Sequence, residues 1–156
     1  MQKKIKILWI DSMPDSLRGF SDTLKSYFSS RDTRQEIGWA TTREEAWKLL
    51  QEDDFQLLII ELALPKNESE KELCMISFNA GIDLLRRYHS EIVSVSNRQF
   101  PVIVFTTTGP GPRMKRAKRQ LRDGDIYIEK TVTIKEFALR TSSIFDEVIR
   151  KTKGTT

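Results

Sequence analysis

Residues 55–65 have the sequence FQLLIIELALP, and this stretch decides the fold. The run from Phe55 to Leu62 is apolar almost throughout, which is typical of a strand that helices cover on both faces of a parallel sheet. One acid, Glu61, interrupts the run, and Pro65 closes it. An acid in such a strand has to be solvated or paired, because burying an isolated carboxylate is costly. Glu61 is therefore the first candidate functional residue.

Four other short stretches have the same strand-like character, and segments of helical periodicity separate them. These stretches are Ile5–Ile10, Glu36–Ala40, Pro101–Thr106 and Asp125–Glu129. Thr42 and Thr133 each precede a Glu by three residues, a capping-box pattern that marks the start of a helix. Strand and helix alternate five times, so we predict an α/β domain with a doubly wound, five-stranded parallel sheet and helices on both faces.

Length and composition indicate one globular domain. The chain has 156 residues and a formal net charge of +4, which fits a single domain over residues 1–150 with a flexible tail at 151–156. One cysteine excludes an intramolecular disulfide and a multi-cysteine zinc site. The apolar runs are too short to span a bilayer or to form a signal peptide, so we expect no membrane association and a cytoplasmic location.

Polar side chains mark the carboxyl ends of the predicted strands. In a doubly wound sheet these ends form one edge, and a crevice opens there where the strand order reverses. We expect the functional residues at this edge, which carries Asp11, Ser12, Glu61, Thr106 and Lys130.

At these residues the sequence resembles the receiver domain of two-component response regulators, over about residues 4–150. The resemblance is carried by four segments in order, ILWIDSMP (7–14), LLIIELALP (57–65), PVIVFT (101–106) and GDIYIEK (124–130). It implies a flavodoxin-like sheet with strand order 2-1-3-4-5. It also implies roles for six residues: an acidic pocket at Asp11 and Ser12, the phosphoacceptor position at Glu61, switch positions at Thr106 and Tyr127, and the family's lysine at Lys130.

The departures from the family are at the reactive positions. The family has a pair of acids where this chain has Asp11 and Ser12, and its phosphoacceptor is Asp where this chain has Glu61. Mg²⁺ prefers several oxygen ligands in octahedral geometry, so Asp11 and Glu61 would bind it only weakly, and we expect no required cofactor. The chain between Pro65 and Gly81 is also longer than the family's turn; residues 66–80 look polar and irregular and would form a lid, a contact loop or a disordered segment.

Glu61 is longer than Asp by one methylene, which moves its carboxylate by about 1.5 Å. Phosphoryl transfer depends on positioning, and a displacement near 1 Å can cost about a hundredfold in rate. We therefore expect Glu61 to remain unphosphorylated and to pair with Lys130 near Thr106, where the family holds its phosphoryl group. Such a pair would mimic the phosphorylated state.

Simpler interpretations stand beside these roles. Asp11 and Ser12 would serve as helix caps, Thr106 would satisfy loop amides, and Tyr127 would be an ordinary core aromatic.

A basic segment follows the fourth predicted strand, and we predict that Arg113–Arg122 is a helix or half-helix. It holds six cations and no acid, namely Arg113, Lys115, Arg116, Lys118, Arg119 and Arg122. A surface that binds an acidic partner fits this pattern, and a solvated charged face is the simpler alternative. Nucleic acid is less favoured because no aromatic residue is interleaved for base stacking.

The sequence thus predicts a stand-alone, atypical receiver that is not an enzyme and signals through protein contacts without phosphorylation. Its expected partners are a histidine kinase, an output protein with an acidic face, or a second copy bound through the fourth helix, fifth strand and fifth helix. Two alternatives remain, a residual phosphoacceptor in a phosphorelay with weak Mg²⁺ binding, and a small nucleic-acid-binding module that uses the basic helix.

Overall fold

The computed structural model describes residues 4–96 and 99–154. Within them the chain forms a five-stranded, all-parallel sheet with the order β2-β1-β3-β4-β5, which confirms the predicted fold class and strand order. The strands are β1 (Lys4–Ile10), β2 (Arg34–Ala40), β3 (Leu57–Ile60), β4 (Val102–Thr106) and β5 (Ile126–Glu129).

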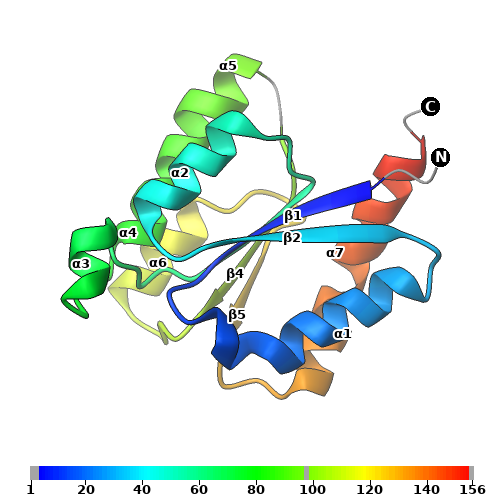
Figure 1. Ribbon diagram of the computed structural model, residues 1–156, viewed down its shortest axis with the longest axis horizontal. Coiled ribbons are helices and arrows are strands. Elements are labelled where there is room, and N and C mark those ends of the chain that lie inside the picture. The colour runs from blue at the N-terminus through cyan, green and yellow to red at the C-terminus, as the bar shows by residue number, and fades with distance from the viewer. Residues whose placement is uncertain (1–3, 97–98, 155–156) are drawn as a thin grey trace.

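Helices cover both faces of the sheet. Figure 1 shows α1 and α7 on one face and α2, α4 and α6 on the other. The core is divided accordingly, because alternate side chains of β1 belong to two different apolar clusters. The helical segments are η1 (Pro14–Leu17), α1 (Arg18–Ser29), α2 (Arg43–Glu52), α3 (Glu68–Glu72), α4 (Ala80–Arg87), the π-helical η2 (Tyr88–Val93), α5 (Ser94–Ser96), α6 (Pro112–Arg119) and α7 (Ile134–Gly154).

Strand β3 is buried along its whole length but ends earlier than predicted. All four residues of Leu57–Ile60 are fully buried, as the apolar run indicated. The predicted strand continued to Leu62, whereas the observed one stops at Ile60. The reason is local, because the Glu61 carboxylate accepts hydrogen bonds from the amides of Leu62 and Ala63 and so takes those donors out of the sheet ladder.

The insertion at 66–80 is more regular than predicted, since it contains the short helix α3. Asn67 begins this helix by accepting a hydrogen bond from the Glu70 amide at 3.0 Å, and the Glu70 carboxylate accepts one from the Lys66 amide at 2.7 Å. The pattern missed α3 because this helix has no buried residue and therefore no apolar period.

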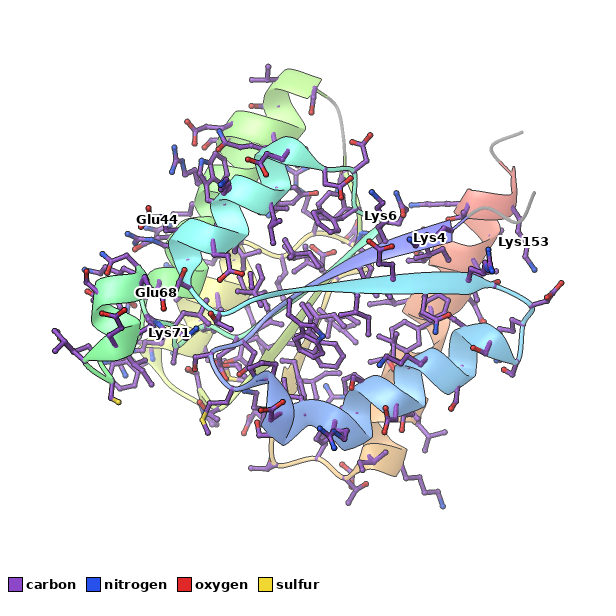
Figure 2. All side chains as sticks on the ribbon, in the orientation of Figure 1. Lys4, Lys6, Glu44, Glu68, Lys71 and Lys153 are labelled. Atoms are coloured by element: carbon purple, nitrogen blue, oxygen red, sulfur yellow. The ribbon has the colours of Figure 1, made fainter. Side chains whose placement is uncertain are left out.

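The insertion is attached to the start of α2. The first two amides of α2, at Arg43 and Glu44, donate to the carbonyls of Pro65 and Lys66 at 3.0 and 2.9 Å. The Lys71 ammonium donates to the Thr41 hydroxyl at 2.8 Å. These bonds satisfy helix-end donors that would otherwise lack partners. Figure 2 shows Glu44, Glu68 and Lys71 in this region, where α3 lies beside the start of α2.

Three predicted details need correction. Helix α6 ends at Arg119, so Arg122 lies beyond it. Helix α7 continues to Gly154, four residues into the predicted tail, and residues 155–156 lie outside the described part of the chain. At the capping boxes the threonine side chains accept the predicted amide bonds, but the Glu45 carboxylate reaches the Thr41 amide and not that of Thr42.

Candidate functional site

The candidate site lies at the carboxyl edge of the sheet, where the sequence predicted it. Asp11, Glu61 and Lys130 directly follow strands β1, β3 and β5, and Thr106 is the last residue of β4. Backbone bonds hold these positions in register: the Glu61 amide donates to Ile10 at 2.9 Å, and the Lys130 amide donates to Thr106 at 2.8 Å. The side chains therefore converge from four neighbouring strands.

The Glu61 carboxylate is buried, with an exposed fraction of 3%, and its first oxygen is enclosed by donors. Oε1 accepts hydrogen bonds from the amides of Leu62 at 2.7 Å and Ala63 at 3.1 Å. It also accepts a short bond from the Thr106 hydroxyl. A buried carboxylate is tolerated when its lone pairs are satisfied in this way.

The second oxygen of Glu61 has the charged partner. Oε2 lies 2.8 Å from the Lys130 ammonium and accepts the Thr107 amide at 3.1 Å. The same ammonium lies 2.5 Å from Asp11 Oδ2. The predicted ion pair between Glu61 and Lys130 is thus present, and Lys130 bridges two carboxylates.

Electrostatics keep this bridge charged. Burial by itself lowers the pKa of the Lys130 ammonium, but the charges of Glu61 and Asp11 outweigh it, and the pKa is raised overall. One ammonium faces two carboxylates, so the group carries a net charge of about −1 when all three are ionised.

Ser12 is the predicted site residue that the structure does not bring into this network. Among the described residues its side chain has no hydrogen-bond partner. It is not an N-cap either, because the residue before η1 is Met13, which makes no side-chain cap bond. Asp11 has a double role, since Oδ1 accepts the Met13 amide at 2.8 Å while Oδ2 binds Lys130.

The residues present do not fit Mg²⁺. The described residues contain no group of three or more His, Cys, Asp or Glu side chains placed to hold a metal ion. Both oxygens of Glu61 already accept hydrogen bonds, and the Lys130 ammonium lies between Glu61 and Asp11, where it would repel a cation.

The two predicted switch residues are linked to the site by hydrogen bonds. The Thr106 hydroxyl, which donates to Glu61, accepts the Thr108 amide at 3.1 Å. The Thr108 carbonyl in turn accepts the Tyr127 hydroxyl at 2.6 Å. Tyr127 belongs to the apolar core as well, and burial, followed by the charges of Glu129 and Glu61, raises its pKa to about 12.

The basic segment lies beside this network. The Lys118 ammonium is 5.5 Å from the centre of the Tyr127 ring, and the Arg113 guanidinium is 4.4 Å from that of Phe78. Within the described residues none of the six cations forms an ion pair with a carboxylate. The six are Arg113, Lys115, Arg116, Lys118, Arg119 and Arg122.

Sequence reasoning missed the backbone part of the site. The amides of Leu62, Ala63 and Thr107 carry no side-chain signature, so only the folded chain shows that they face Glu61. A weak signal was available at Gly81, where α4 passes close to this turn. The Gly81 amide donates to Leu62 at 2.9 Å, and a Cβ on Gly81 would lie 2.5 Å from the Leu62 Cα.

No protein-family model and no curated protein matches this chain. Solved structures of receiver domains do match this chain. A CheY-like response regulator receiver domain from Methanospirillum hungatei JF-1 is 19% identical, with a TM-score of 0.62 and coverage of 96% of this chain and 99% of that one. A two-component response regulator from Clostridium difficile is 20% identical, with a TM-score of 0.60 over 91% and 96%. The non-phosphorylated HemR receiver domain from Leptospira biflexa is 23% identical, with a TM-score of 0.59 over 90% and 94%.

At these identities the likeness establishes the fold, which is the flavodoxin-like fold of response-regulator receiver domains. None of the described helices combines the length and the apolar character needed to cross a membrane. A fold of this kind hosts many activities, so the function has to be argued from the site.

Proposed function

We propose that this chain is a receiver-type signalling domain that acts without phosphorylation, as a binding module and not as an enzyme. The observation that carries the proposal is the position of the Glu61 carboxylate. It accepts bonds from three backbone amides and a hydroxyl and pairs with an ammonium.

Such a set of donors is an anion site. Backbone amides, a hydroxyl and an ammonium that converge on one point stabilise negative charge, most strongly where water is excluded. In the family that the sequence resembles, the phosphoryl group lies near the hydroxyl residue and the lysine. Here the longer arm of Glu61 brings a carboxylate to Thr106 and Lys130, so the protein's own side chain takes the place of the phosphoryl group.

The occupied site is connected to the surface by a short chain of contacts. The Glu61–Thr106 bond leads through Thr108 to the Tyr127 hydroxyl, and the Lys118 ammonium lies over the Tyr127 ring. Because Glu61 is a permanent part of the chain, we propose that these residues stay in one arrangement and that α6 is presented in one conformation.

The surface around α6 suits a protein partner with an acidic face. Five of the six cations are exposed and the sixth, Arg116, is half-buried, and they lack carboxylate partners within the described part of the chain. A histidine kinase or an output protein with an acidic face would supply the carboxylates that these cations lack. Electrostatic complementarity would speed the encounter and select against basic partners.

The same geometry disfavours the phosphoacceptor alternative. Attack on a phosphodonor needs a free carboxylate oxygen and a metal to neutralise charge, as phosphoryl transfer generally does. Both Glu61 oxygens are hydrogen-bonded, and its side chain is almost inaccessible.

Incubation with a small phosphodonor and Mg²⁺, followed by intact-mass measurement, tests the proposal. We expect no phosphoryl adduct on the wild-type chain. The matched comparison is the double variant Ser12→Asp with Glu61→Asp, which restores the family's acid pair and phosphoacceptor and should gain an adduct. A stable adduct on the wild type that disappears in Glu61→Gln would overturn the proposal.

A further inference from the structure

The segment after α3 exposes apolar side chains that a monomer would be expected to bury. Leu73, Met75, Ile76 and Phe78 are exposed to 71%, 51%, 50% and 52%. They lie within six consecutive residues of the insertion at 66–80. Exposed apolar side chains gathered in one short segment are typical of an interaction surface, and these four form the apolar patch.

The backbone under this patch is held in place. Leu64 and Ser77 exchange two backbone bonds, of 3.1 and 2.9 Å, and the Met75 amide donates to Glu70 at 2.8 Å. Cys74 adopts a positive φ of 53°, which turns the chain between α3 and the apolar residues. The patch is thus presented by an ordered segment, and a partner would pay little entropy to bind it.

Opposite charges flank the patch. On one side lies α3, where Glu68 and Glu72 are exposed and stand one helical turn apart. On the other side lies the basic helix α6, whose Arg113 contacts Phe78. A groove of about 550 Å³ separates Phe78 from the loop before α6 and is lined by Arg113 and Arg116.

We propose that a second copy of this chain covers the patch. In a two-fold dimer both subunits use the same surface. A contact between one residue of the first subunit and another residue of the second is therefore repeated with the subunits exchanged. Along this surface the acids of α3, the apolar patch and the cations of α6 follow one another. A two-fold rotation reverses this order in the second copy, so acids face cations and the apolar patches face each other. The apolar segments meet at the centre, and the α3 acids of each copy face the α6 cations of the other.

The inference rests on one part of the proposed function, that α6 is a protein-contact surface, and not on the state of Glu61. It differs from the dimer expected from the sequence, whose fourth helix, fifth strand and fifth helix correspond to α6, β5 and α7 of the structure. In the dimer proposed here the insertion supplies the centre of the interface. A chain that stays monomeric would overturn the dimer, whereas a phosphoryl adduct on Glu61 would overturn only the phosphorylation-independent state.

Sedimentation equilibrium across the micromolar range tests the dimer. We expect the full chain to approach twice its monomer mass of 18.2 kDa as concentration rises, with weaker association at high salt. Leu73→Gln should weaken the association by about tenfold or more, since it removes an apolar side chain from the centre. The matched control is Leu139→Gln, at a leucine of α7 that is exposed to 68% and lies outside the patch.

A charge-swap experiment tests the pairing of α3 with α6. The variant Glu68→Lys with Glu72→Lys should stay monomeric, and so should the variant Arg113→Glu with Arg116→Glu at the two cations beside Phe78, because each places like charges opposite one another. Mixed in equal amounts, the two should form a heterodimer, since every acidic face then meets a basic one.

Four results would overturn the inference. The wild-type chain would remain a monomer at every concentration, Leu139→Gln would weaken the dimer as much as Leu73→Gln, or the mixed charge variants would fail to associate. Association that disappears on nuclease treatment would also overturn it, because a nucleic acid and not a second copy would then occupy the basic surface.

Discussion

Replacement of Glu61 by Gln removes one charge while preserving the size of the side chain. The amide oxygen of Gln can keep the bonds that Oε1 accepts from Leu62, Ala63 and Thr106. The amide nitrogen then takes the place of Oε2, where it faces the Thr107 amide. Two donors face each other there, and neither has an acceptor.

The loss can be estimated from these contacts. A hydrogen bond to a charged group contributes about 1.5–3 kcal/mol, and a buried donor left without a partner costs about 1–3 kcal/mol. The Lys130 ammonium keeps the Asp11 carboxylate as a partner at 2.5 Å, so the substitution does not leave a buried cation unpaired. We therefore expect Glu61→Gln to lower the free energy of unfolding by about 3 kcal/mol, near the bottom of the range of about 3–5 kcal/mol for a broken buried ion pair.

Thermal and urea unfolding at neutral pH measure this change. For a chain of this size about 3 kcal/mol corresponds to a fall in Tm of roughly 6–12 °C. The matched control is Glu91→Gln, because Glu91 also pairs with a cation, here Arg87, but both of these side chains are half exposed. The control should change stability by about 0.5 kcal/mol or less. Equal effects of the two substitutions would refute the argument that Glu61 is the buried centre of the site.

Three further substitutions probe the network around this centre. Wild-type stability should fall as pH rises from about 10 towards 12, because the folded state keeps Tyr127 protonated with its pKa raised to about 12. The Tyr127→Phe variant should lose less stability over this pH range, measured by urea unfolding. If its free energy of unfolding falls with pH as steeply as that of the wild type, Tyr127 is not the group responsible. Thr106→Val removes the hydroxyl that donates to Glu61 and should cost about 1–3 kcal/mol in the same assay, while a neutral effect would show that the bond contributes nothing. Gly81→Ala should lower Tm by several degrees, since its Cβ would lie 2.5 Å from the Leu62 Cα, and a Tm at or above that of the wild type would show that the turn relaxes freely.

The sheet was predictable because its strands coincide with short apolar runs in the sequence. The apolar runs and the alternation of strand and helix sufficed for a parallel sheet with polar residues at its carboxyl edge. The strand order and the pairing of Glu61 with Lys130 were predicted from the resemblance to receiver domains. The sheet and its polar edge depend on the alternation of strand and helix, which is local in the sequence, and on the rule that parallel strands share one carboxyl edge.

The insertion was not predictable in the same way. Helix α3 has no buried residue, and the contacts that hold the insertion in place are made to Thr41 and to the first amides of α2. Tertiary contacts of this kind leave no periodicity in the sequence. The exposure of Leu73 and Phe78 was equally hidden, since apolar letters in a sequence ordinarily indicate burial.

Ser12 makes no side-chain hydrogen bond in the described structure, yet its identity bears on the site through charge. Lys130 faces two carboxylates, those of Asp11 and Glu61, and an acid at position 12 would add a third. Without a metal ion, one ammonium would then have to balance three negative charges in a largely buried site, and the added charge would favour protonation of one carboxylate or its movement towards solvent. Compared with the receiver pattern that the sequence resembles, Ser12 in place of an acid and Glu61 in place of Asp are therefore mutually consistent: Ser12 adds no further charge beside Lys130, and Glu61 supplies a carboxylate that the lysine and backbone amides satisfy.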